Sequence, residues 1–136
     1  MARLSSLVCV APSKVSDVWP HVEKMIDDAY AAVDQITPDV RTWLIEEKGL
    51  LWIAVAENSK IVAALTTSLV QRRSGLACRM VAAGGEGIDY CLPHLDEIEL
   101  YAEKEGCYKI VLEGRSGWKR VFTGYKPVSV KMEKII

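Results

Sequence analysis

The chain has 136 residues, of which 50% are hydrophobic and 26% are charged. This composition excludes a disordered chain and predicts one packed domain over residues 1–136. The 17 Lys and Arg residues against 18 Asp and Glu give a net charge of -1, which leaves no basic excess for a nucleic-acid partner. No apolar run approaches the roughly 20 residues that cross a bilayer, so we expect no membrane association.

The cysteines argue against a metal site. Cys9, Cys78, Cys91 and Cys107 are widely scattered, and none belongs to a Cys-x-x-Cys pair. The 2 histidines are too few for a mixed zinc site of the usual spacing. Scattered cysteines of this kind are typical of reduced thiols, which predicts a cytoplasmic protein.

The N-terminal part predicts a strand followed by two helices. Residues 4–11 alternate weakly and indicate the strand. Apolar residues then recur at three- and four-residue intervals over 16–33, which predicts an amphipathic helix. Pro20 is expected in its first turn, where a missing N–H is harmless. Residues 37–39 (Thr-Pro-Asp) predict the start of a second helix, and Gly49 its end.

The middle of the chain predicts a three-strand meander. Two β-rich runs, 50–57 and 60–71, flank a turn composition and predict a hairpin. A third strand is expected over 76–83. A glycine-rich break follows, and then a helix over 90–105 that Gly106 would end.

The C-terminal part predicts a buried strand over 108–112, a short helix over 116–122 and a half-buried strand over 127–133. The element order is therefore β-α-α-β-β-β-α-β-α-β. It predicts an α/β (α+β) domain with a mixed, mainly antiparallel central sheet and helices on both faces.

This order resembles the GNAT family of N-acetyltransferases. The hairpin 51–69 is similar to the family's second and third strands, and residues 85–87 (Gly-Glu-Gly) resemble the end of its pyrophosphate loop, R/Q-x-x-G-x-G/A. The helix that ends at 102–106 and the strand 109–112 resemble its central helix and fifth strand. Residues 124–128 resemble its C-terminal "GF" turn. The resemblance implies a GNAT-like fold over nearly the whole chain.

The resemblance also implies acetyl-CoA as co-substrate and an amine as acceptor. In the family, two neighbouring strands splay apart and offer backbone groups to pantetheine, while N–H groups at a helix start hold the pyrophosphate. The residues that would offer backbone groups to pantetheine are Val81, Ala82 and Ala83. Those that would offer N–H groups to the pyrophosphate are Gly85, Glu86, Gly87 and Ile88.

The sequence departs from the family pattern at three positions. Ala82 stands where the loop has Arg or Gln, and Glu86 puts a carboxylate between the glycines. Arg120 stands where the family often has a tyrosine general acid, and a guanidinium cannot give up a proton near neutral pH. A second hypothesis is therefore a catalytically inactive acetyltransferase-fold protein that serves as a binding or assembly subunit.

Several candidate catalytic residues have both a functional and a purely structural interpretation. Glu113, at the end of a strand, is a candidate base, but it is also placed for a surface ion pair with Arg115. Tyr90 is a candidate phenol. His94 and Asp89 are further candidate bases, although Asp89 also suits a helix cap. No partner for the His94 ring is evident from the sequence.

Two further segments have open interpretations. The stretch 114–120 holds three cations and an indole, so Arg115 and Trp118 are candidates for clamping the adenine-side phosphates of CoA. A tight turn with a buried indole explains it equally well, and the stretch resembles small GNAT-like proteins of bacteriophage and prophage genomes. Residues 66–68 are candidates for an acceptor site or ordinary β-formers. The 4 tryptophans leave a homo-oligomer open.

Overall fold

The computed structural model describes residues 5–32, 40–82, 91–113, 124–126 and 132–136. Its strands form a 5-stranded sheet in the order β1-β2-β3-β4-β5. Neighbours from β1 to β4 are antiparallel, whereas β5 runs parallel to β4. The strands are β1 (Ser5–Val10), β2 (Leu50–Ala56), β3 (Ile61–Arg72), β4 (Gly75–Ala82) and β5 (Lys109–Glu113). The predicted mixed, mainly antiparallel sheet is thus confirmed.

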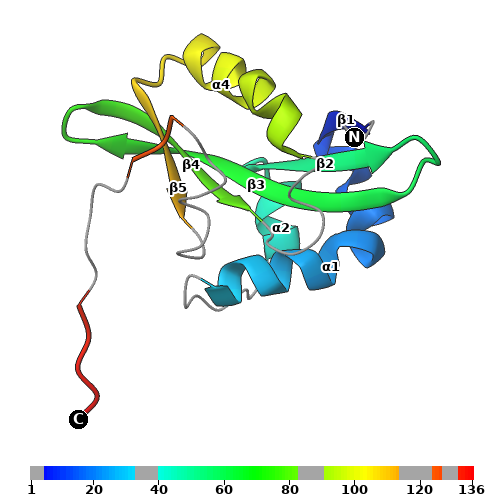
Figure 1. The fold of residues 1–136 in the computed structure, drawn as a ribbon, viewed down its shortest axis with the longest axis horizontal. Coiled ribbons are helices and arrows are strands. Elements are labelled where there is room, and N and C mark those ends of the chain that lie inside the picture. Colours follow the sequence, from blue (N-terminus) through cyan, green and yellow to red (C-terminus); the bar gives the residue numbers. More distant parts are fainter. Residues whose placement is uncertain (1–4, 33–39, 83–90, 114–123, 127–131) are drawn as a thin grey trace.

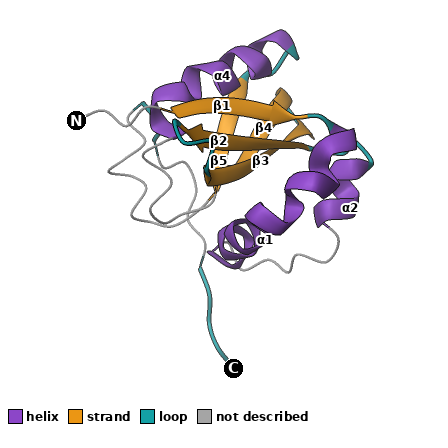
Figure 2. Cartoon of the chain, turned by 90° about the vertical axis from the view of Figure 1, so that its right-hand side faces the viewer, coloured by secondary structure: helices purple, strands orange, loops and turns teal. Residues whose placement is uncertain are grey.

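Helices cover both faces of this sheet, as predicted. The helices α1 (Val15–Ala32) and α2 (Val40–Ile45) lie on one face, and α4 (Leu95–Lys104) lies on the other (Figures 1 and 2). A short 3₁₀ turn at Leu92–His94 leads into α4. The predicted helix 116–122 and residues 127–131 of the predicted last strand lie outside the described residues.

Helix α1 begins earlier than the sequence predicted. Pro20 was expected in the first turn, but the helix starts at Val15 and contains Pro20 in its interior. Proline has no N–H, so one hydrogen bond to the preceding turn is missing there. The reason for the early start is Val15, which is 1% exposed and packs in the core with residues from α2 and β2. Burying this side chain outweighs the lost hydrogen bond.

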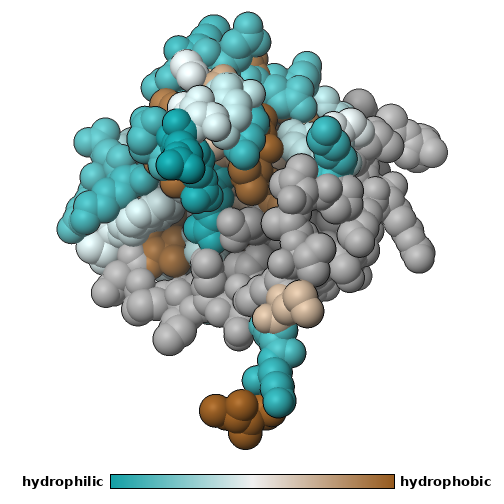
Figure 3. Space-filling view, turned by 90° about the vertical axis from the view of Figure 1, so that its left-hand side faces the viewer, coloured by the Kyte–Doolittle hydropathy of each residue, from teal (hydrophilic) through white to brown (hydrophobic). Residues whose placement is uncertain are grey.

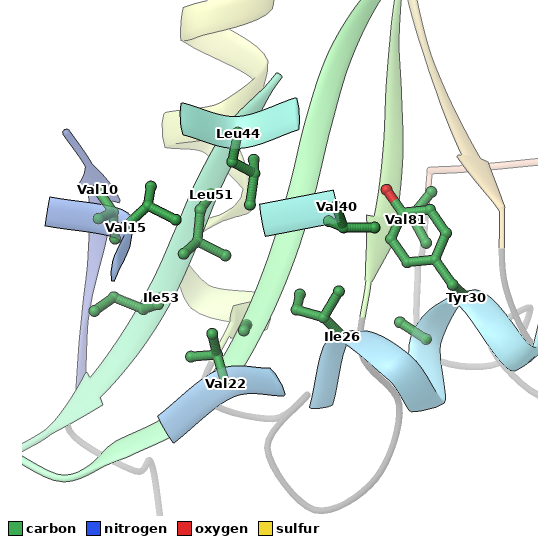
Figure 4. Close-up of a cluster of buried hydrophobic side chains, with 12 residues drawn as sticks. Val10, Val15, Val22, Ile26, Tyr30, Val40, Leu44, Leu51, Ile53 and Val81 are labelled. Atoms are coloured by element: carbon green, nitrogen blue, oxygen red, sulfur yellow. The ribbon is translucent and has the colours of Figure 1, made fainter. Parts of the chain in front are cut away.

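Each face of the sheet has its own hydrophobic core. Alternating side chains of β2 and β3 point to opposite faces, so both strands contribute to both cores. The α1-side core is formed by Val10, Val15, Val22, Ile26, Ala29, Tyr30, Val40, Leu44, Leu51, Ile53, Ala64 and Val81. The α4-side core is formed by Trp52, Ala54, Ala63, Leu65, Met80, Cys91 and Ile98. Figure 4 shows the α1-side core, in which α1 and α2 pack against the sheet.

Helix α2 ends at Ile45, four residues before Gly49, the glycine that was predicted to stop it. Glu47 takes the left-handed conformation, with φ 61°. Its N–H donates to the Leu44 oxygen, and the N–H of Lys48 donates to the Trp43 oxygen, at 3.1 Å each. These two bonds form a Schellman motif, the position at which glycine is usual. Helix α4 ends in the same motif with Gly106 at φ 86°, as the sequence predicted.

The contrast between the two helix ends predicts a stabilising substitution. Glu47→Gly should raise the free energy of unfolding by about 1 kcal/mol. A side chain in the left-handed region costs roughly 1–2 kcal/mol, and the greater backbone entropy that glycine gives the unfolded chain offsets part of the gain. Urea unfolding of the two proteins measures the difference. Glu47→Ala, which keeps a Cβ in that conformation, is the matched control and should show no gain. A Gly variant that is no more stable than this Ala variant would contradict the prediction.

The C-terminal residues 132–136 extend away from the sheet (Figures 1 and 3). They belong to no regular element, so Met132 and Glu133 are not in the strand predicted for 127–133. Ile135 and Ile136 at the tip are fully exposed. Within the part of the chain that the structure describes, no helix is long and apolar enough to cross a membrane.

Candidate active site at the end of the parallel strand pair

One row of residues crosses the sheet near the end of β4. Thr66 on β3 lies between Leu51 on β2 and Val81 on β4, and Val81 is in turn paired with Glu113 on β5. Neighbouring strands lie about 4.8 Å apart, so the Cα atoms of Thr66 and Glu113 are roughly 10 Å apart. The candidate base Glu113 thus stands in the same row as the buried threonine.

The pairing of β4 with β5 bears on the expectation that two neighbouring strands splay apart. The register is continuous from Ala77 with Lys109 to Val81 with Glu113, which is the full length of β5. The described residues therefore show no separation of the two strands at Val81. Ala82 pairs with Leu65 on its other side but has no partner in β5 among the described residues. Within the described residues, the pairing of β4 with β5 therefore ends at Val81 and Glu113.

On the face of the sheet that α1 covers, a buried hydrogen bond joins the helix to this row of residues. The Tyr30 hydroxyl on α1 lies 3.0 Å from the Thr66 hydroxyl. Tyr30 is 7% exposed and Thr66 is 1% exposed. The tyrosine ring lies beside Val81 with its hydroxyl directed toward the sheet (Figure 4). The periodicity of α1 correctly predicted that Tyr30 lies on the apolar face, but it gave no sign of the hydroxyl's partner, which is 36 residues away.

On the opposite face the next threonine makes an equivalent bond. The Trp52 indole Nε1 donates to the Thr67 hydroxyl at 2.9 Å. The Trp52 ring also meets the Tyr101 ring edge-on, with centroids 5.6 Å apart and an interplanar angle of 67°. Thr66 and Thr67 are therefore bonded inside the two cores and do not line an acceptor site, so the reading as structural β-residues is favoured.

Burial of Tyr101 predicts a loss of stability at high pH. Desolvation, followed by the Glu105 carboxylate, raises the pKa of Tyr101 from 10.0 to about 12. The fold thus favours the protonated phenol, so its contribution to stability is complete below pH 10 and is lost as the pH rises through about 12.

Tyr101→Phe removes this titration and keeps the ring against Trp52. The midpoint of urea unfolding should fall less between pH 10 and pH 12 in this variant than in the wild type. Tyr108→Phe, at an exposed tyrosine, is the matched control and should behave as the wild type does. Equal losses in the wild type and Tyr101→Phe would refute the prediction.

His94 has partners that the sequence did not reveal, and they place it away from the β4–β5 pair. Its Nε2 donates to the backbone oxygen of Ser5 at 2.9 Å, and its Nδ1 lies 3.6 Å from a Glu97 carboxylate oxygen. Ser5 begins β1, which is at the opposite edge of the sheet from β5. His94 therefore anchors the start of α4 to β1 and is not a candidate base at the β4–β5 end.

Tyr125, in the segment that resembles the "GF" turn, packs against the sheet's α4 side. Gly124 before it has φ 86°, a conformation that favours glycine. The Tyr125 ring packs against the α4-side core, and its hydroxyl donates to the Glu99 carboxylate on α4 at 3.2 Å. Burial, and then the Glu99 charge, raise the pKa of Tyr125 well above its usual value, so the phenol keeps its proton in this bond.

Most of the predicted site residues lie outside the described part of the chain. Glu113, Val81 and Ala82 are placed as described above. The following lie outside the described residues: Ala83, Gly85, Glu86, Gly87, Ile88, Asp89, Tyr90, Arg115, Trp118 and Arg120. In the described ranges, no group of three or more His, Cys, Asp or Glu side chains is arranged to hold a metal ion.

The similarity of this chain to known proteins lies in its structure. No family model matches the sequence, and no curated protein matches it. The fold is similar to that of a predicted acetyltransferase from Clostridium acetobutylicum, solved with acetyl-CoA, at 17% identity and a TM-score of 0.62, covering 97% of this chain and 96% of that one.

Two further solved structures are similar over the same extent. A GCN5-related N-acetyltransferase from Ralstonia eutropha has 14% identity and a TM-score of 0.66, with 97% of this chain and 99% of that chain covered. Glucosamine-6-phosphate N-acetyltransferase from Arabidopsis thaliana has 14% identity and a TM-score of 0.61, with 97% and 98% covered.

Proposed function

Because the chain has the fold of the GNAT N-acetyltransferases, we propose that it binds acetyl-CoA and transfers the acetyl group to an amine. The observation that carries this proposal is the agreement of fold over nearly the whole length of both chains. The end of the described β4–β5 pairing at Val81 supports it, because backbone groups beyond a paired segment are suited to bonding the amides of pantetheine. We propose residues 1–136 as a single domain in the cytoplasm, consistent with four free thiols.

The proposal assigns roles to residues of this chain. Ala82 and Ala83, which follow the paired residue Val81, would bond pantetheine through the backbone. The N–H groups of the loop 85–88 would hold the pyrophosphate at the start of the following helix. Arg115 and Trp118 would clamp the adenine-side phosphates. Tyr90 remains a candidate phenol near the loop.

Glu113 would act as the base that takes a proton from the amine nitrogen. Its position as the last residue of β5, paired with the last residue of β4 that has a β5 partner, supports this role. A carboxylate at a strand end beside the thioester would be within reach of an incoming amine.

Two features favour a second function. The continuous pairing of β4 with all of β5 leaves Val81 without a free edge, and Ala82 stands where the family loop has Arg or Gln. Both features suit an acetyltransferase-fold binding or assembly subunit that has no catalytic activity. Such a subunit would neither bind acetyl-CoA nor consume it.

Isothermal titration with acetyl-CoA distinguishes the two functions. Saturable heat at or below millimolar ligand, with a rise in melting temperature, supports the transferase. Loss of thioester absorbance should then be followed with glucosamine 6-phosphate, a polyamine and a short peptide with a free N-terminus as acceptors. No heat and no thermal shift would overturn the transferase proposal and favour the binding subunit.

A further inference from the structure

We propose that the outer edge of β1 is a homodimer interface, at which the β1 strands of two copies of this chain pair antiparallel around Val8. Among the described strands β1 pairs only with β2, so it forms an edge of the sheet (Figure 2). Its residues Ser6, Val8 and Cys9 are exposed. The inference is independent of the proposed acetyltransferase function, because β1 and β5 lie at opposite ends of the strand order.

The direction of the backbone groups in β1 follows from its pairing with β2. Ala56 donates its N–H to the Lys60 oxygen and accepts the Ser59 N–H, at 2.9 Å each, so both of its groups point away from β1. Ser5 is paired with Ala56, and its own N–H and C=O therefore point outward, away from β2. The His94 ring agrees with this direction, because its Nε2 donates to the Ser5 oxygen at 2.9 Å.

Leu7 and Cys9 also point their N–H and C=O groups outward, because every second residue of a strand points its groups to the same side. Among the described residues, no hydrogen bond to these outward groups is found. Val8 is 42% exposed and Cys9 is exposed as well. Neighbouring side chains of a strand point to opposite faces, so the edge is open on both faces of the sheet.

A second copy of the chain is the occupant that this edge fits. When two β1 strands run antiparallel with Val8 facing Val8, Leu7 of each copy lies opposite Cys9 of the other. The outward groups of these two residues then bond one another across a two-fold axis perpendicular to the sheet. A register with Leu7 facing Leu7 would need Ser5, whose oxygen is already bonded to His94. The register centred on Val8 uses only the groups that are left.

The composition of β1 permits this pairing. Edge strands are usually protected by a charge, a proline or a bulge, whereas Ser5–Val10 (SSLVCV) contains no charge or proline and its register with β2 is continuous. No like charges therefore meet at the axis, and each copy has a net charge of only -1. The facing valines form a β-branched cross-strand pair. Two such short strands make a contact at the low end of the usual interface size, so we expect a Kd of about 10–100 µM.

Disulfide cross-linking tests the register. Facing residues between hydrogen-bonded pairs have Cα atoms about 4.5 Å apart, which a disulfide can span. Val8→Cys in a Cys9→Ser background should therefore convert most of the chain to a covalent dimer under mild oxidation at about 100 µM protein. Ser6→Cys in the same background is the matched control. It is exposed on the same strand, but its two copies would lie about 13 Å apart, so it should stay monomeric.

Sedimentation equilibrium from about 5 to 500 µM measures the association itself. The wild type should dimerise, and Val8→Lys should weaken the dimer at least about 10-fold, because it places two ammonium groups opposite each other. Leu100→Lys, at a leucine of α4 that is 52% exposed, is the control and should associate as the wild type does. Both variants should keep the wild-type melting temperature within a few degrees, since they change exposed side chains.

Three results would overturn the interface. These are a wild type that stays monomeric at about 500 µM, a dimer that Val8→Lys leaves unchanged, and equal cross-linking of Val8→Cys and Ser6→Cys. The first result would leave the β1 edge to an extended segment of another protein. None of the three bears on the titration with acetyl-CoA, so the proposed function is tested separately.

Discussion

Gly49→Ala is expected to lower the free energy of unfolding by about 1–3 kcal/mol, the usual cost of overpacking a core. A Cβ at this position would lie 2.0 Å from Cη2 of Trp43 and 2.3 Å from Cζ3. The indole packs against the α1-side core, so it can move away only by giving up part of that contact. Chemical denaturation of the variant and the wild type measures the loss.

The assignment of this loss to the indole can be tested by a double-mutant cycle. In a Trp43→Val background, which lacks the ring, Gly49→Ala should cost less than about 0.5 kcal/mol. Gly106→Ala is a useful comparison, because a Cβ there meets nothing within 4 Å and only the φ of 86° is unfavourable. Equal costs of Gly49→Ala with and without the Trp43 ring would show that the clash is not the cause.

Gly85→Trp is expected to abolish measurable heat on titration with acetyl-CoA. The family resemblance implies that the pyrophosphate approaches the backbone N–H groups at this glycine, and an indole would prevent that approach. Losing two hydrogen bonds to a charged group at about 1.5 kcal/mol each amounts to about 3 kcal/mol, or roughly 100-fold in affinity.

The control for Gly85→Trp is the same side chain placed at the other end of β4. Ser74 is exposed in the turn that precedes this strand, so Ser74→Trp should bind acetyl-CoA as the wild type does. Both variants should keep the melting temperature of the wild type within a few degrees. Binding by Gly85→Trp at wild-type affinity would remove the loop 85–88 from the proposed site.

The strands and the long helices could be predicted from the sequence because their signals are local. The β-rich runs 50–57 and 60–71, with a turn composition between them, identified the hairpin. Gly106 identified the end of α4 through the left-handed conformation that glycine adopts easily. Pro20 and Gly49 were misplaced for a different reason. The start of α1 depends on the burial of Val15, and the end of α2 on Glu47 accepting a strained φ, and both follow from packing between distant segments.

The candidate site was less predictable, since it depends on which residues share a row of the sheet. Glu113 was proposed from its place at a strand end, and the register puts it opposite Val81. The Tyr30–Thr66 hydrogen bond could not be predicted, because a tyrosine at a helical spacing of apolar residues looks like any other core residue. His94 was proposed although it is bonded to β1, because contacts between segments 89 residues apart leave no mark on local sequence.

The consecutive threonines of β3 bear on how the sheet finds its alignment during folding. Strand side chains alternate between faces, so a one-residue shift of β3 would bring either Thr67 opposite Tyr30 or Thr66 opposite Trp52. In the first case Thr66 would lie in the place of Leu65, and in the second Leu65 would lie opposite Tyr30, so either shift buries one hydroxyl without its partner at a cost of about 1–3 kcal/mol. The pair of hydroxyls therefore acts as a check on strand alignment, rejecting misaligned sheets that hydrophobic burial alone would tolerate.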